Sequence, residues 1–238
     1  MAAKHPRFPR AGLEFLRALK RNNRRPWFQK HREEYERFVR APMVELVWAL
    51  RKEFARIAPE MVADPAVSLY RIYRDTRFSA DKSPYKTHTA AVFPRRGLGK
   101  HSGAGFYFHI APDEVLVAGG IYLPGPGELV ALREHIAQNY RELETIVEAS
   151  AWKKAFGQLE GEKLSRVPRG LPADHPAAEY LKHKQFLAAC QFAPDFATSP
   201  RFYPTLVDCF GSLLPLIRFL NEPLVRAAQR RRALPERL

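Results

Sequence analysis

The apolar residues of this 238-residue chain change their spacing twice along the sequence, and that change limits the folds open to it. Before residue 58 they recur every three or four positions, as expected of helices. Between Val67 and Tyr122 the period changes, and residues 70–75 and 106–110 alternate between two faces, which is typical of strands. Helical spacing returns at Glu128. Helices on both sides of a block of strands predict an α+β fold.

The expected helices are residues 12–21, 26–38, 42–57, 128–148, 176–189 and 204–220. The expected strands are residues 67–75, 87–93, 106–110 and 115–122. Short connections between successive strands predict an antiparallel four-stranded sheet at about residues 67–122, covered by the N- and C-terminal helices. Residues 152–175 are expected to hold little regular structure, and Pro215 to kink or divide the last helix. Gly119 and Gly120 indicate a bulge, or a place where a neighbour approaches the backbone closely.

The size and composition of the chain fit one large folded domain. A hydrophobic content of 46% is enough for a substantial core. We expect a single α+β domain at residues 1–222, followed by a basic C-terminal tail at residues 223–238. The only cysteines, Cys190 and Cys209, make no disulfide framework, and the N-terminus lacks the apolar segment of a signal peptide. These features predict a cytoplasmic protein with no membrane partner.

Positive charge dominates the composition, with 39 Lys and Arg against 25 Asp and Glu and a net charge of +14. Residues 1–40 carry +8 and residues 69–100 carry +6. Such a balance favours anionic partners. Nucleic-acid binding and a generally arginine-rich composition both explain it.

Residues 69–93 hold a cluster of charge, on both faces of a predicted strand and in the loop after it. Its cations are Arg71, Arg74, Arg77, Lys82 and Lys86. Asp75 and Asp81 can neutralise two of them, and Ser79, Ser83 and Thr87 can donate hydrogen bonds. Because guanidinium forks match phosphate and carboxylate oxygens, the surplus charge predicts an anion site. The alternative is a charge-lined hairpin pinned by its own Arg–Asp pairs.

A second basic set comprises Lys163, Arg166, Arg169, Lys182, His183 and Lys184. Arg166 and Arg169 would join the ligand-binding residues if this region folded back over the sheet; otherwise the set is an exposed basic surface. Known catalytic motifs are absent from the sequence, and Asp75 with His88 is the only acid–base pair that it suggests. His88, His101 and His109 are expected to be structural, so neither a metal nor a cofactor is predicted.

The string at residues 71–86, Arg-Ile-Tyr-Arg-Asp-Thr-Arg-Phe-Ser-Ala-Asp-Lys-Ser-Pro-Tyr-Lys, resembles the signature of a conserved hypothetical family, domain of unknown function 2461. Residues 22–28, 164–170 and 215–221 are similar to other parts of that family, so the resemblance covers roughly residues 8–222. It implies no reaction and no catalytic residues.

Three functional hypotheses follow. In the first, the chain binds a phosphorylated or carboxylated small molecule at the basic cluster, and whether it is also an enzyme is left open. In the second it binds nucleic acid through its basic surface, with Trp27, Tyr35 or Tyr73 available for stacking. In the third the charged string only stabilises the fold, and the chain has a structural or interaction role.

Overall fold

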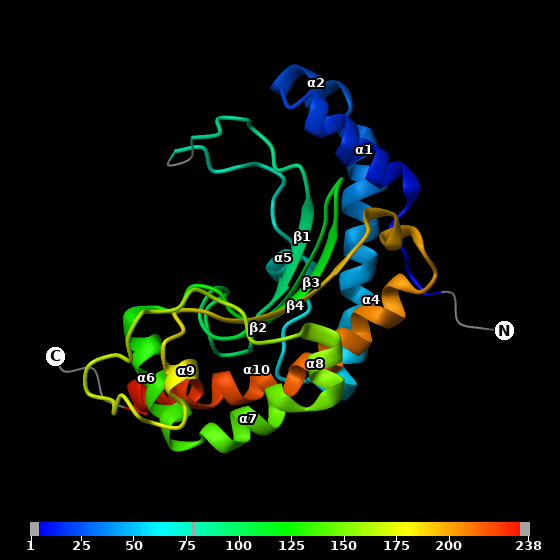
Figure 1. Ribbon diagram of the computed structural model, residues 1–238. Helices are drawn as coiled ribbons and strands as arrows, with labels where there is room; N and C mark the ends of the chain where they lie inside the picture. The colour runs from blue at the N-terminus through cyan, green and yellow to red at the C-terminus, as the bar shows by residue number, and fades with distance from the viewer. Residues whose placement is uncertain (1–4, 78–79, 234–238) are drawn as a thin grey trace. The chain divides into compact units, whose positions relative to one another are not determined.

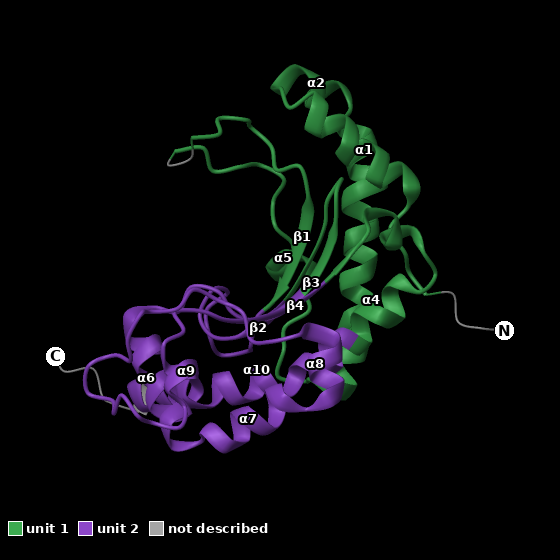
Figure 2. Ribbon diagram, in the orientation of Figure 1, with its two compact units in different colours: residues 1–93, 107–117, 191–208 green, residues 94–106, 118–190, 209–238 purple. Residues whose placement is uncertain are grey.

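The computed structural model of the chain describes residues 5–77 and 80–233. Its contacts divide the chain into two compact units, coloured separately in Figure 2. Unit 1 comprises residues 1–93, 107–117 and 191–208, and unit 2 comprises residues 94–106, 118–190 and 209–238. Each unit therefore combines segments that are distant in the sequence.

Unit 1 is largely helical. Its helices are α1 (Arg10–Arg21), α2 (Arg25–Lys30), α3 (Arg32–Tyr35), the π-helical turn η1 (Glu36–Arg40), α4 (Ala41–Ile57), α5 (Pro65–Ser68) and the 3-10 helix η2 (Pro194–Thr198). The helices expected at residues 12–21 and 42–57 are confirmed as α1 and α4, and the one expected at 26–38 is divided among α2, α3 and η1. The predicted apolar stripe of α4 is buried, and its Phe54 packs edge-on against Phe93 of the sheet, along which Figure 1 shows the helix.

The predicted antiparallel sheet of four strands is confirmed. Its strands are β1 (Thr89–Phe93), β2 (Gly105–Ile110), β3 (Val115–Ile121) and β4 (Phe186–Phe192), in the spatial order β1-β2-β3-β4. On β2, Phe106, Phe108 and Ile110 are fully buried while the residues between them are half-buried. One face of this strand therefore carries the core, as its alternation predicts.

The first predicted strand, residues 67–75, is not a regular strand. Pro65–Ser68 forms α5, because the Asp64 carboxylate accepts the Ala66 N–H and caps a helical turn that begins with proline. Beyond α5 the segment forms only isolated bridges, Leu69 with Ala91 and Tyr73 with Tyr85. The sequence was therefore right about extended, paired chain after residue 68 and wrong about a continuous ladder.

The fourth strand comes from a segment predicted as helix, residues 176–189. Only α9 (Ala178–Leu181) is helical there, and β4 follows at Phe186. A short apolar run fits the helical and the strand period equally well, so the spacing at residues 186–189 predicted a helix where the structure has a strand. Gly120 explains the pairing: with φ of +132°, any Cβ on it would lie 1.9 Å from the Phe186 carbonyl oxygen. Gly120 thus marks a close backbone approach between β3 and β4, whereas Gly119 faces the Leu213 and Ile217 side chains.

The other helices of unit 2 differ from expectation mainly at their breaks. They are α6 (Pro126–Gln138), α7 (Tyr140–Glu148), α8 (Ser150–Phe156) and α10 (Phe202–Ala233), the last of which begins in unit 1. Asn139 separates α6 from α7, and its side-chain amide caps the carbonyl of His135. α8 lies partly in the segment expected to be irregular. Phe106 stacks on Phe210 of α10 at 4.8 Å in the core of this unit.

α10 is a single helix that contains both Pro215 and Pro223, so Pro215 does not divide it. The buried flanking residues Leu213, Leu216 and Ile217 hold the helix together across the lost hydrogen bond. The helix also passes through residue 222, where the basic tail was expected to begin. The boundary at residue 222 stays a prediction, and residues 234–238 lie outside the described part of the chain.

Candidate functional site

The charged string folds back on itself as two paired limbs, residues 69–77 and 80–88, which we call the arm. The Arg74 N–H donates to the Pro84 carbonyl at 3.0 Å, and the Lys86 N–H donates to Ile72 at 2.8 Å. Pro84 has no N–H to return, so the pairing stops there. Near and beyond that point, Arg74, Thr76 and Lys82 of the two limbs line a pocket together with residues of α2 and α3.

Two side chains of the N-terminal region, Asn23 and Phe28, contact Tyr85 of the arm. The Asn23 amide donates to the Tyr85 carbonyl at 2.9 Å, and its oxygen accepts the Tyr85 N–H at 3.1 Å. The Phe28 ring of α2 stacks on the Tyr85 ring at 4.1 Å between centroids. Both rings are buried, at 3% and 4% exposure. The double hydrogen bond and the stacked rings fix the arm beside α2.

A pocket of 410 Å³ lies between the arm and α2 and α3, within unit 1. Its cationic residues are Arg25, Arg32, Arg74 and Lys82, and its other residues are Phe28, Gln29, Tyr73, Thr76, Pro84 and Tyr85. No carboxylate lines it among the residues that the structure describes. Four positive groups that line one pocket repel one another, and an anion bound between them would reduce that repulsion.

The cations of the pocket are incompletely matched. Arg74 pairs through Nη1 with Asp81, yet its Nε is buried and has no hydrogen-bond partner in the described structure. The Lys82 ammonium donates to the Thr76 carbonyl at 2.9 Å. For Arg25 and Arg32, no carboxylate of the described chain lies within ion-pair distance. A buried guanidinium N–H without an acceptor is energetically costly.

The Tyr85 hydroxyl is also influenced by the two unmatched arginines. Burial raises its pKa, with a smaller contribution from Tyr73, while the positive charges of Arg25 and Arg32 act in the opposite direction. The two guanidinium groups are therefore close enough to Tyr85 to act on the same pocket electrostatically.

Of the five predicted cations on the arm, the structure brings Arg74 and Lys82 into the pocket. Arg71 instead lines a smaller pocket of 260 Å³, with Arg40. Arg77 grips Asp75 with two hydrogen bonds, of 3.0 and 2.8 Å. The Lys86 ammonium lies 4.9 Å from the centre of the Tyr70 ring. Ser79, predicted as a donor, lies outside the described residues.

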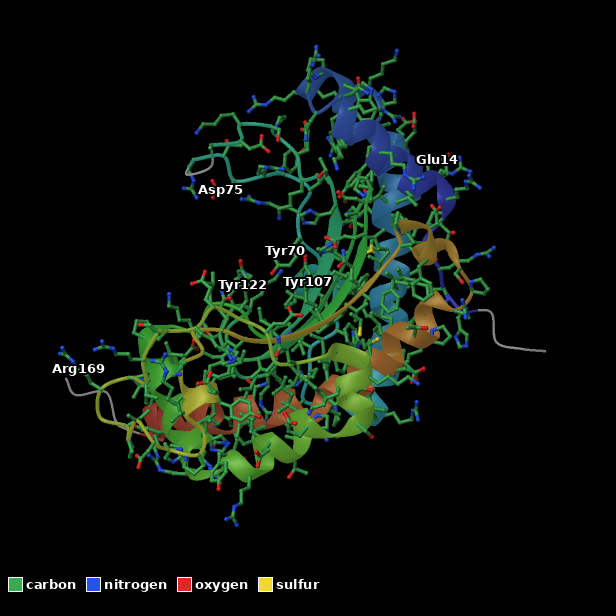
Figure 3. All side chains as sticks on the ribbon, in the orientation of Figure 1. Glu14, Tyr70, Asp75, Tyr107, Tyr122 and Arg169 are labelled. Carbon is green, nitrogen blue, oxygen red and sulfur yellow. The ribbon has the colours of Figure 1, made fainter. Side chains whose placement is uncertain are left out.

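The suggested acid–base pair is not formed in the described structure. The hydrogen bonds from Arg77 lower the pKa of Asp75 to about 2. Figure 3 shows Asp75 far along the arm, away from Tyr70 and Tyr107 near the sheet. His88 lies 5.4 Å from His109, ring to ring. Burial lowers the pKa of His88 to about 4, so its imidazole is neutral at neutral pH.

A chain of hydrogen bonds lies on the sheet in unit 1, next to His88. Tyr107 and the Nδ1 atom of His109 are 3.1 Å apart, and His109 Nε2 lies 3.1 Å from Glu114. Gln191 donates to the other oxygen of Glu114 at 2.7 Å. Because each member already has a partner inside the chain, this arrangement accounts for the burial of these polar groups. The described residues contain no group of His, Cys, Asp or Glu arranged to hold a metal ion.

The second basic set lies in unit 2, and three of its lysines are matched by glutamates. Glu179 pairs with Lys182 at 2.6 Å and with Lys163 at 3.8 Å, and Lys184 pairs with Glu162 at 3.2 Å. Arg166 and Arg169 are exposed. Their contribution to the ligand site remains a prediction, since every residue that lines the 410 Å³ pocket belongs to unit 1.

The sequence reasoning missed the residues that α2 and α3 contribute. Arg25 and Phe28 belong to the family-like segment at residues 22–28, and Gln29 and Arg32 follow it on a predicted helix, but none of the four was predicted to bind a ligand. The sequence segment at residues 22–28 was a signal, because it resembled a family motif and carries the asparagine that holds the arm. Tyr73 was named as a stacking residue for nucleic acid, and the structure places it in the pocket wall.

Comparison with known proteins gives one match. The model of a family described as conserved hypothetical protein, DUF2461, matches residues 11–219, which confirms the resemblance seen in residues 71–86. Neither the curated proteins nor the solved structures provide a match. None of the described helices has the length and apolar content needed to cross a membrane.

Proposed function

Because the chain belongs to the conserved hypothetical protein family DUF2461, whose description names no ligand, we propose its function from the pocket itself: the chain binds a small phosphorylated or carboxylated molecule there. The supporting observation is an incompletely matched set of cations around a defined volume. Arg25 and Arg32 approach from the helices, and Arg74 and Lys82 from the arm.

The geometry favours an oxyanion over a simple halide. Guanidinium groups offer paired N–H donors at a spacing that suits two oxygens of one phosphate or carboxylate. Arg25 and Arg32 can supply such donors, because both are exposed and line the pocket. A volume of 410 Å³ lies within the usual range of small-molecule sites, about 300–1,000 Å³.

The test compares two neighbouring arginines by titration calorimetry. Arg25 lines the pocket, whereas Arg24 precedes α2, is exposed and is not among the lining residues. With inorganic phosphate and acetate as probes, we expect Arg25→Gln to weaken binding of the better probe about tenfold, because one charge-assisted contact is lost. Arg24→Gln removes the same charge and should leave the affinity unchanged.

The proposal fails if the two variants behave alike, since binding would then follow net charge and not the pocket. It also fails if phosphate, acetate and the neutral control glycerol raise the melting temperature of the parent chain equally. Equal unfolding midpoints for the two variants without ligand will show that both substitutions leave the fold intact.

A further inference from the structure

The pocket contains an exposed aromatic ring, and an anion alone does not explain it. Tyr73 is 49% exposed, although its ring lies 5.5 Å from that of Tyr85 and 6.4 Å from that of Phe28. Two buried rings thus brace a third ring that faces the open volume. A large exposed ring held rigidly inside a pocket is a surface for stacking.

Gln29 adds hydrogen-bonding capacity of a particular kind. It lies on α2, lines the same pocket and is exposed. Its side chain makes no hydrogen bond within the described chain. An amide offers donors and an acceptor together, and so matches the edge of a nucleobase, which presents both kinds of group.

From these observations we infer that the ligand is a nucleoside phosphate, whose base stacks on Tyr73 and whose phosphate is held by Arg25, Arg32 and Arg74. This inference rests on the proposed function and adds the chemical class of the ligand. A simple carboxylate would use only the cations, and a sugar phosphate could add hydrogen bonds to Gln29 but has no planar ring to stack on Tyr73. A nucleoside phosphate uses all three features within one pocket.

The experiment separates the base from the phosphate. Calorimetry on the full chain compares AMP and UMP with ribose 5-phosphate, which has the same phosphate and sugar but no base. We expect the better nucleotide to bind at least about tenfold more tightly than ribose 5-phosphate, because stacking adds to the ionic contacts. Tyr73→Ala should abolish that advantage and leave ribose 5-phosphate binding unchanged, while Tyr73→Phe should preserve it.

Equal affinities of the parent chain for the nucleotides and for ribose 5-phosphate would overturn this inference and leave the proposed function standing. If none of these phosphates binds, and inorganic phosphate and acetate do not bind either, the proposed function itself fails. A single-stranded oligonucleotide without a terminal phosphate serves as a further probe. If it binds more tightly than AMP and UMP, with an affinity that falls steeply as salt rises, the pocket belongs to nucleic acid and the inference is wrong.

Discussion

The two basic regions of this chain look alike in sequence and differ in structure. In the arm and the helices beside it, Arg25, Arg32 and the Nε of Arg74 lack acidic partners or acceptors in the described structure. In unit 2, the lysine cluster of Lys163, Lys182 and Lys184 is matched by two glutamates.

The difference shows that positive charge in a sequence segment does not by itself make an anion site. Glu162 and Glu179 come from the same short region as the lysines that they neutralise. The arginines of the pocket come from two segments that meet only in the folded chain, and neither segment supplies a carboxylate to the pocket wall. Three tests of this contrast follow, from the largest expected effect to the smallest.

Acid should destabilise the arm region more than the lysine cluster. Burial, with smaller effects from His109, Lys86 and Arg74, lowers the folded-state pKa of His88 from 6.5 to about 4, against an opposing effect of Asp113. Between about pH 6.5 and pH 4, His88 is therefore protonated in the unfolded chain and neutral in the folded chain. Stability should fall as pH drops from about 6.5 and level off below about 4, with a contribution of about 3 kcal/mol.

The measurement is urea unfolding of the parent, His88→Gln and His183→Gln at pH 7 and pH 4.5. The pKa of His183 is also lowered by burial and by Lys163, but Glu179 and a hydrogen bond with Gln185 oppose that shift. We expect His88→Gln to remove more of the acid sensitivity than His183→Gln does. Parallel losses of stability in all three proteins would contradict the assignment.

A carboxylate placed in the pocket should neutralise its arginines, as the glutamates of unit 2 neutralise the lysine cluster. Gln29→Glu puts a negative charge beside Arg25 and Arg32, so it should lower the affinity for inorganic phosphate about tenfold through competition for the same cations. Gln158→Glu makes the same charge change at an exposed position of unit 2 and should have no effect. Equal losses in both variants, measured by calorimetry, would show that long-range charge governs binding.

Removing a carboxylate from unit 2 should not create a binding site. Glu179→Gln leaves Lys163 and Lys182 without their shared partner, yet these side chains lie on the surface, where ion pairs contribute little. We expect an unchanged unfolding midpoint and no additional phosphate bound per chain. A second equivalent of phosphate in the calorimetric titration would mean that unmatched surface charge is sufficient.

The sequence predicted the fold class better than the set of residues that line the pocket. Alternation identified β2, because its buried face is apolar and its half-buried face carries Tyr107 and His109. The turn at Pro112-Asp113 indicated β3, which is apolar on both faces. Apolar spacing misassigned residues 186–189, since a seven-residue apolar strand has no distinguishing period and its place depends on Gly120.

The pocket was harder to predict for a related reason. Local spacing identified the arm cations, and Arg74 and Lys82 do line the pocket. The other half of its wall depends on Asn23, whose partner Tyr85 is 62 residues away in the sequence. Spacing along one segment contains no information about such a pairing, so it could not place Arg25 and Arg32 in the same pocket as Arg74.

The Asn23–Tyr85 connection has a consequence for the kinetics of folding. The pocket does not exist until a chain segment of 62 residues has closed, and long-range closure is slow compared with the formation of α1 or α4. A nascent or partly unfolded chain can therefore present every arginine of the site without being able to retain a ligand. A ligand that binds the pocket would bind only the folded chain, so a high ligand concentration would increase the folded fraction of this protein.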